Sequence, residues 1–371
     1  MYVKLPNLKL ISISFLSVLI AIVFVEFFLR VSNIFIVPPH LTQKSEKFGF
    51  EHIPDARGIN KSNEFDIKVF INSEGLRDYE IPKEKPPNTK RIALVGDSFI
   101  EGIQVELEKT VAKQLESNLG KESFQVINFG VGGYGMDQKF LYIKEKVVVF
   151  NPDTIILFLS SNDLDDIKNN NLLTKENGIL NFRTVKIESS KVKKIKDVLR
   201  KSYLANFLWL LSLKKDQTIS KSIPMEFRLY QGLIDQETQT YLEMTKDLIV
   251  EAKKLTEGNN AEFILITGAD RIQAHPKFTN EFVENYLTTS DKIDYFNKYF
   301  NNFAKENNII YLDLLPIFRR EIENNHDVYF NSDGHWNEYG HGVVARNIAN
   351  FLRVGRSIES SRLRNSDRAN S

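Results

Sequence analysis

The sequence Arg91-Ile-Ala-Leu-Val-Gly-Asp-Ser-Phe-Ile-Glu-Gly102 organises the chain, because it is typical of a buried strand followed by a turn and a helix. Ile92 to Val95 form a short apolar run of the kind expected for a central parallel strand. Gly96-Asp97 ends that run, which puts Ser98 where open α/β sheets bind ligands and unpaired N–H groups stabilise anions. Ser98 is therefore a candidate nucleophile. In the alternative interpretation, Gly-Asp-Ser is only a turn in which Ser98 caps a helix.

Composition narrows the class of protein. The chain has 371 residues, a formal charge of +1 and no cysteine. Its length allows one large α/β domain with additions or two average domains. The balanced charge argues against nucleic acid as an obligatory partner. The lack of cysteine excludes disulfides, thiolate catalysis and cysteine-ligated metal sites, but it does not identify the compartment.

The N-terminus predicts a membrane anchor over residues 1–35. Lys4 and Lys9 precede an apolar run from Leu10 to Leu29, which contains Glu26 near its far end. Twenty helical residues span the hydrocarbon core of a bilayer, which is about 30 Å thick. The run is long for a cleaved signal peptide, and no small-x-small site follows it. The lysines favour a cytoplasmic N-terminus and an extracytoplasmic remainder, although a basic residue directly after the run weakens this bias.

From Arg91 onward, apolar strand patterns alternate with helical ones. This rhythm predicts right-handed crossovers and a parallel sheet with helices on both faces. Before it, residues 36–90 are expected to form a connector with some β structure, including a strand over 65–71. The predicted elements of the alternating part are strands at 92–95, 124–128, 154–159, 261–267 and 309–314, and helices at 107–119, 138–150, 241–255, 293–305 and 343–352.

Two polar motifs follow the second and third of these strands. Asn128-Phe-Gly-Val-Gly-Gly-Tyr-Gly135 is rich in glycine, so its backbone can approach a ligand with N–H groups exposed. It lacks the Lys and Ser/Thr of a phosphate loop, and its spacing fits no dinucleotide fingerprint. After the third strand, Asn162 can present an amide donor to an oxyanion, or it can simply cap a turn.

The last polar cluster, Asn331-Ser-Asp-Gly-His-Trp-Asn-Glu-Tyr-Gly-His341, follows the final strand. His335 is a candidate general base, and Asp333 is a candidate partner that fixes the tautomer of its ring. Metal ligation by Asp333, His335 and His341 is an alternative, but a serine-hydrolase interpretation accounts for the same residues without a metal or another cofactor.

The conjunction of these motifs over residues 91–353 resembles the SGNH (GDSL) hydrolase superfamily, in particular its membrane-anchored bacterial members. The resemblance implies a flavodoxin-like three-layer α/β/α sandwich. It also implies that Ser98 is the nucleophile, that His335 is the base, and that the oxyanion donors are the N–H groups of Ser98 and Gly133 and the side chain of Asn162. The segment Asn72-Ser-Glu-Gly-Leu-Arg77 and the end of the anchor likewise resemble such members.

Two departures from the family pattern concern the site. Ser160 and Ser161 stand where a glycine usually precedes the asparagine of the third block, which predicts a narrower pocket or an added donor. The acid usually stands three residues before the histidine, where this chain has Ser332. Asp333 is the nearest substitute, and its spacing resembles that of relatives that acetylate surface polysaccharides. Asp97 is expected to order the turn.

Two further segments lie outside the strand–helix rhythm. Residues 164–240 are expected to be a helical insert: a lid, a helix on anionic lipid, or a solvated helix that covers the sheet. The tail, residues 354–371, is polar and charged and is expected to be disordered.

Three classes of function remain open. The first is an extracytoplasmic serine esterase or deacylase that acts on ester-linked acyl groups of envelope glycans or lipids. The second is an O-acyltransferase that passes the acyl group to a sugar hydroxyl. The third is a catalytically silent envelope assembly or binding module, for which a lost Ser98 or His335 would be expected, but both residues are present. The oligomeric state is not predicted.

Overall fold

The computed structural model describes residues 8–31, 40–176, 179–185, 199, 202–208, 223–286 and 288–369. The chain divides into two compact units. One unit contains Met1–His40 and Ile187–Ser222, and the other contains Leu41–Lys186 and Ile223–Ser371.

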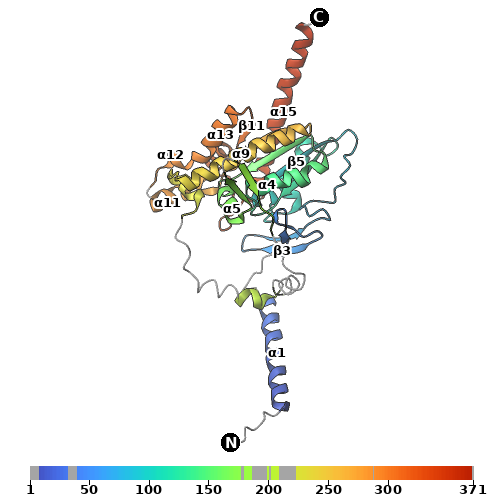
Figure 1. Ribbon diagram of the computed structural model, residues 1–371, viewed down its shortest axis with the longest axis vertical. Coiled ribbons are helices and arrows are strands. Elements are labelled where there is room, and N and C mark those ends of the chain that lie inside the picture. The colour runs from blue at the N-terminus through green and yellow to red at the C-terminus, as the bar shows by residue number, and fades with distance from the viewer. Residues whose placement is uncertain are drawn as a thin grey trace. The chain divides into compact units, whose positions relative to one another are not determined.

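A five-stranded parallel sheet forms the centre of the larger unit (Figure 1). The strand order is β11-β10-β7-β5-β6. When the five strands are numbered by their position in the chain and read from β6, this order is 2-1-3-4-5, as in flavodoxin-like folds. The predicted strands are confirmed, with small shifts at their ends. Their bounds are β5 Lys90–Gly96, β6 Phe124–Gly130, β7 Thr154–Leu159, β10 Glu262–Thr267 and β11 Ile310–Asp313.

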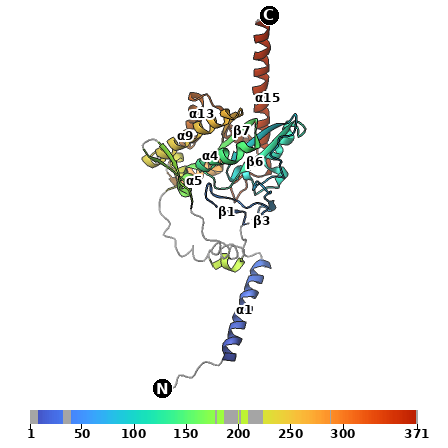
Figure 2. The same cartoon turned by 45° about the vertical axis from the view of Figure 1, so that its right-hand side comes forward.

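Helices cover both faces of this sheet, as Figures 1 and 2 show. Alternate residues of β5 point to opposite sides, so Ile92 and Leu94 join one apolar cluster and Ala93 and Val95 join the other. The first cluster includes residues of α3 (Val111–Leu119), α14 (Leu315–Glu323) and α15 (Glu338–Ala369). The second includes residues of α4 (Met136–Tyr142), α9 (Gln236–Gly258) and α13 (Tyr295–Glu306). The fold is therefore the three-layer α/β/α sandwich expected from the sequence.

Short elements connect these layers. They are α2 Ser98–Glu101, η1 Leu107–Lys109, η2 Ile143–Val147, η3 Val148–Phe150, α5 Asp163–Asn170, α8 Met225–Gln231, α10 Arg271–Ala274, α11 Pro276–Tyr286 and α12 Ser290–Ile293. The helix expected over 138–150 is thus divided into α4, a π turn and a 3-10 turn. The β-branched run Val147-Val148-Val149 disfavours a regular helical end there.

The segment expected as a connector is part of the larger unit. Its two antiparallel hairpins pair β1 (Thr42–Ser45) with β2 (Gly49–His52) and β3 (Arg57–Lys61) with β4 (Asp66–Phe70). Phe48, Leu76 and Ile81 belong to one of the two sheet-covering cores. Because this apolar surface is buried against the sandwich, residues 41–90 fold with the sheet rather than as a separate connector. Residues 41–78 are called the N-terminal β segment below.

The insert and the tail also differ from the expectation. Strand β8 (Leu173–Glu176) pairs antiparallel with β9 (Ile179–Phe182), so the insert is not wholly helical. Much of the middle of the insert, residues 186–198, 200–201 and 209–222, lies outside the described residues. The tail was expected to be disordered, but α15 continues to Ala369. Adding residues to an established helix needs no new nucleation, so a polar sequence can extend it.

The smaller unit contains α1 (Leu8–Val31). Among the described residues, Ser12–Val31 is the one stretch long and apolar enough to cross a membrane, with a mean hydropathy of 2.5 over 20 residues. Most of the large apolar side chains described on this helix are exposed, Val23 by 61%, whereas Leu29 is buried.

Candidate active site

The turn that carries the candidate nucleophile, called the nucleophile turn below, lies between β5 and α2. Asp97 caps α2 by accepting the N–H of Phe99 at 2.9 Å, and Ser98 is the first residue of the helix. A side chain at Gly96 would collide with Ile100, so only glycine lets α2 fold back against the strand end. The sequence therefore places Ser98 at the carboxyl end of β5, an interior strand of the sheet.

The structure brings Ser98, His335 and Asp333 together. Ser98 Oγ lies 2.8 Å from His335 Nε2, although the two residues are 237 positions apart. On the other side of the ring, Nδ1 lies 2.5 Å from Asp333 Oδ1. A carboxylate accepts and cannot donate, so Nδ1 carries the proton and Nε2 is left to accept the hydroxyl proton of Ser98.

The electrostatics of this pair favour an ionised acid. Burial tends to raise the pKa of Asp333, but the hydrogen bond and charge of His335 and the charge of Arg271 hold it below the usual value. A carboxylate that stays ionised stabilises an imidazolium ring beside it.

Three candidate oxyanion donors lie on different elements. Gly133 has φ +77 in the loop after β6, and a Cβ on the adjacent Gly132 would be 3.6 Å from Cβ of Ser98. In the described part of the chain, the N–H groups of Ser98 and Gly133 have no protein acceptor. The amide of Asn162 donates to Asp166 at 2.8 Å, so it is oriented within its own helix, and among the described residues it forms no hydrogen bond with Ser98.

A buried polar network lies under the nucleophile turn. The ammonium of Lys139 donates to Asp163 at 2.5 Å and to Asp97 at 3.3 Å, and Ser160 Oγ donates to Asp97 at 2.5 Å. Burial tends to lower the pKa of Lys139, but the two carboxylates raise it. Asp97 therefore orders the turn and does not contact His335. Ser160, which replaces the usual glycine, adds a donor to this network.

The N-terminal β segment supports the glycine loop. His52 on β2 contacts Glu101 Oε1 at 2.8 Å through Nε2, and its Nδ1 lies 3.2 Å from the carbonyl of Gly75. The other oxygen, Glu101 Oε2, accepts the N–H of Gly132 at 2.8 Å. This carboxylate thus joins the nucleophile helix to the loop that carries Gly133.

The same segment supports the loop that carries the acid and the base. Glu64, in the turn between β3 and β4, accepts the N–H groups of three successive residues: Asn331 at 2.7 Å, Ser332 at 2.8 Å and Asp333 at 3.2 Å. Burial tends to raise the pKa of Glu64, but these donors lower it. A single carboxylate therefore fixes the backbone at Asp333.

Arg77 at the end of the N-terminal β segment holds the far side of the nucleophile turn. Its guanidinium donates to the carbonyls of Glu101 at 2.8 Å, Gly102 and Val105. The motif Asn72-Ser-Glu-Gly-Leu-Arg77 was noticed in the sequence, but its contacts were not predicted. No sequence pattern pointed to His52 or Glu64, since neither residue follows the end of a strand of the main sheet.

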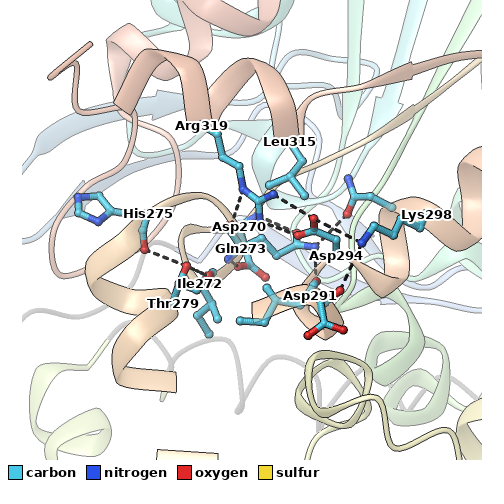
Figure 3. A network of polar contacts seen from close by, with 12 residues as sticks. Asp270, Ile272, Gln273, His275, Thr279, Asp291, Asp294, Lys298, Leu315 and Arg319 are labelled. Atoms are coloured by element: carbon cyan, nitrogen blue, oxygen red, sulfur yellow. Dashed lines mark hydrogen bonds and ion pairs between the residues drawn. The ribbon is translucent and has the colours of Figure 1, made fainter. Parts of the chain in front are cut away.

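Helix α10 supports the acid–base loop from another direction. Arg271 donates to the carbonyl of Asn331 at 2.6 Å. The helix is fixed by the network drawn in Figure 3, in which Arg319 donates to the carbonyl of Gln273 at 2.8 Å and to Asp294 at 2.5 and 3.0 Å. Asp270 caps the start of α10. The loop that carries His335 is therefore held by charged groups on two sides.

The geometry of the described residues does not match the alternative interpretation of Asp333, His335 and His341 as metal ligands. No three metal-ligating side chains of the described residues lie close enough together to share an ion. His341 is buried beside Arg77 and does not join Asp333 and His335, and its Nδ1 has no partner among the described residues.

Structural comparisons find distant likenesses. A lipolytic G-D-S-L family protein from Desulfitobacterium hafniense is 13% identical, with a TM-score of 0.39 over 71% of this chain and 99% of that one. A catalytic mutant of the acetylxylan esterase Axe2 from Geobacillus stearothermophilus is 12% identical, with a TM-score of 0.40 over 72% and 96%. A lipase/acylhydrolase from Enterococcus faecalis is 14% identical, with a TM-score of 0.37 over 71% and 96%. These likenesses are too distant to assign a substrate.

A comparison with curated proteins gives no match. A family model does match residues 231–366, and its description is "SGNH hydrolase-like domain, acetyltransferase AlgX". The matched range contains Asp333 and His335, while Ser98 lies before it. Over residues 231–366 the chain is therefore similar to an SGNH hydrolase-like domain.

Proposed function

We propose that the protein is a membrane-anchored, extracytoplasmic serine esterase or deacylase that works through an acyl-enzyme on Ser98. The observation that carries this proposal is the line of contacts from Ser98 Oγ to His335 Nε2 at 2.8 Å and from Nδ1 to Asp333 at 2.5 Å. This arrangement can activate a hydroxyl at neutral pH, which a turn with a capping serine does not require.

In the proposed first step, His335 takes the proton of Ser98 while Oγ bonds to the ester carbonyl carbon. The N–H groups of Ser98 and Gly133 and the amide of Asn162 hold the oxyanion, and Asp333 stabilises the imidazolium. His335 then gives its proton to the departing alcohol, and an acyl-enzyme remains. Water activated by the same ring attacks the acyl carbon and releases the acid, which restores Ser98.

A second candidate differs only in the acceptor. A sugar hydroxyl in place of water would make the protein an O-acyltransferase with the same acyl-enzyme. The family description, which names an acetyltransferase, favours this candidate. So does the position of the acid two residues before the base, which resembles relatives that acetylate surface polysaccharides.

The proposed substrate is an acylated glycan or lipid of the cell envelope. The support is α1, whose length and apolar surface suit a membrane span, together with the lysines that precede it. The near-neutral charge of the chain gives no reason to invoke nucleic acid.

Fluorophosphonate labelling of the detergent-solubilised protein tests the nucleophile. The wild type should be modified at Ser98, as shown by mass mapping of the labelled peptide, and Ser98→Ala and His335→Ala should not react. Absence of labelling in a wild type shown to be folded by circular dichroism would favour the silent binding module instead.

Product analysis separates the two candidates. The wild type is supplied with an acetylated glycan, with and without an unacetylated oligosaccharide as acceptor. An esterase releases acetate at the same rate in both mixtures, whereas a transferase forms acetylated oligosaccharide and releases little acetate without it. Asn162→Ala should slow either reaction by about 10²–10³ if its amide holds the oxyanion.

A further inference from the structure

The smaller unit joins two segments that are far apart in the sequence. The carboxylate of Glu26 on α1 accepts the hydroxyl of Ser202 at 2.9 Å and the N–H groups of Tyr203 at 3.0 Å and Leu204 at 2.9 Å. These residues begin the short helix 203–208, which Figure 1 shows beside the end of α1. Glu26 therefore caps a helix that begins 177 residues later.

A second contact joins the same two segments, α1 and helix 203–208. Arg30, one turn after Glu26, pairs with its carboxylate at 2.7 Å, and its guanidinium lies 4.9 Å from the ring centre of Tyr203. The acid, the base and the aromatic ring thus form one cluster, and this cluster holds the start of helix 203–208 against α1.

The position of Glu26 sets the level of this cluster relative to a bilayer. Glu26 lies five residues before the end of the apolar stretch Ser12–Val31, which is about 8 Å along a helix axis. A carboxylate is costly deep in lipid but tolerable near the interface, where Arg and Tyr are also favoured. The charged and aromatic groups of the cluster therefore belong at the bilayer surface, and helix 203–208 begins at the same level.

The side chains of the short helix suit that environment. It contains Tyr203, Leu204, Phe207 and Leu208, and Leu208 is 56% exposed. An apolar side chain exposed at the level of the headgroups meets lipid rather than water, and its burial there is favourable.

We propose that residues 202–208 form a second membrane contact, an interfacial helix that lies in the outer headgroup region and is held to α1 by Glu26. This proposal rests on the membrane span of the proposed function. Its partner is the lipid bilayer itself. The larger unit, which contains the candidate active site and is called the catalytic unit below, is then joined to a membrane-attached unit at three points of the chain, 40/41, 186/187 and 222/223, rather than at one. Such attachment favours substrates that lie close to the bilayer.

The lack of cysteine makes a direct test possible. Leu208→Cys in the full-length protein is labelled with an environment-sensitive fluorophore and reconstituted in phosphatidylethanolamine/phosphatidylglycerol vesicles that contain lipids with a quencher near the headgroup. The probe should show a blue shift and lose emission to the quencher. Val23→Cys, 61% exposed in the span, is the positive control, and Ile59→Cys, 54% exposed on β3, is the control in the catalytic unit.

The outcomes are distinct. If the Leu208 probe behaves like the Ile59 probe while the Val23 probe is in lipid, the proposal of an interfacial helix is wrong, whereas the proposed membrane span is supported. If the Val23 probe is also in water, the membrane anchoring of the proposed function fails as well. Glu26→Ala should move the Leu208 probe toward water and leave the Val23 probe in place, and Glu26→Gln, which keeps one acceptor oxygen, should have a smaller effect. An unchanged Leu208 probe in Glu26→Ala would contradict the capping role of Glu26.

Discussion

Asp333 is the residue on which the proposed mechanism can be tested most narrowly. Its carboxylate lies 2.5 Å from His335 Nδ1 and remains ionised because its pKa is held below the usual value. Asp333→Asn keeps the shape of the side chain but removes the charge that stabilises the imidazolium. We expect kcat on an activated ester to fall by about 10²–10⁴, with the larger loss typical of a buried triad acid.

Ser332→Ala is the matched control, because Ser332 occupies the usual family position of the acid. Its side chain should be dispensable, and the variant should keep the wild-type kcat. A reversed pattern, with Asp333→Asn active and Ser332→Ala impaired, would show that the acid of this site had been assigned to the wrong residue.

His341 should make folding stability depend on pH. Burial, together with the charges of Arg77 and His335, lowers the pKa of His341 from 6.5 to about 3. Between these values the unfolded chain binds a proton on this ring and the folded chain does not. Stability should therefore be independent of this ring above pH 6.5 and fall as the pH is lowered toward 3, by at most about 1.4 kcal/mol per pH unit.

Urea unfolding of His341→Gln and wild type at pH 7.5 and pH 5 measures this effect. The difference in the free energy of unfolding between wild type and His341→Gln should shrink or reverse at pH 5. The wild type loses stability there because its unfolded chain binds a proton on His341, whereas the glutamine of the variant binds none. His326→Gln serves as the control, since that ring is half exposed. If the difference between His341→Gln and wild type is the same at both pH values, burial of a neutral imidazole is not a source of acid sensitivity.

At the scale of elements, the candidate catalytic groups could be predicted from the sequence because they follow strand ends. Strand β5 is a continuous apolar run that stops at Gly96-Asp97, so its end and the hydroxyl after it can be predicted from local patterns. The residues that support the site cannot be predicted from local patterns. Glu64 lies in an exposed turn of a small hairpin, and only the tertiary fold places it beside residues 331–333.

Glu64 should act on the reaction through the loop that it holds. Glu64→Ala leaves the three N–H groups of 331–333 to water, which loosens the backbone that positions Asp333 and His335. A misplacement of about 1 Å can cost about 10² in rate, and we expect a fall in kcat of that order at most. The rate of fluorophosphonate labelling at Ser98, measured across pH, reports the placement of His335 directly.

Glu64→Gln keeps one acceptor oxygen and should recover part of the labelling rate. Asp66→Ala, on the same hairpin, controls for damage to β4, since Asp66 pairs only with the exposed Lys61 among the described residues. Equal losses in Glu64→Ala and Asp66→Ala would mean that the hairpin as a whole, and not the Glu64 carboxylate, supports the loop.

At the scale of the whole molecule, the division of the chain was the least predictable feature. Composition separates the anchor from the rest, and the strand–helix rhythm begins at β5, so the sequence suggested a separate connector before the sheet. Burial of Phe48, Leu76 and Ile81 against the sandwich joins that segment to the catalytic unit. The contacts of Glu26 with 202–204 join part of the insert to the anchor. Both results depend on contacts distant in sequence, which no local pattern encodes.

The proposed membrane span can take either of two orientations, and the charges that flank it favour one of them. Lys4 and Lys9 precede the span and favour a cytoplasmic N-terminus, but Arg30 follows it and weakens the bias. We expect Ile59→Cys, exposed on β3, to react with a membrane-impermeant maleimide in intact expressing cells, and Lys4→Cys to react only after lysis. The cysteine-free wild type gives the background. Labelling of Lys4→Cys alone in intact cells would place the catalytic unit in the cytoplasm, and an envelope substrate would then be untenable even if Ser98 were reactive.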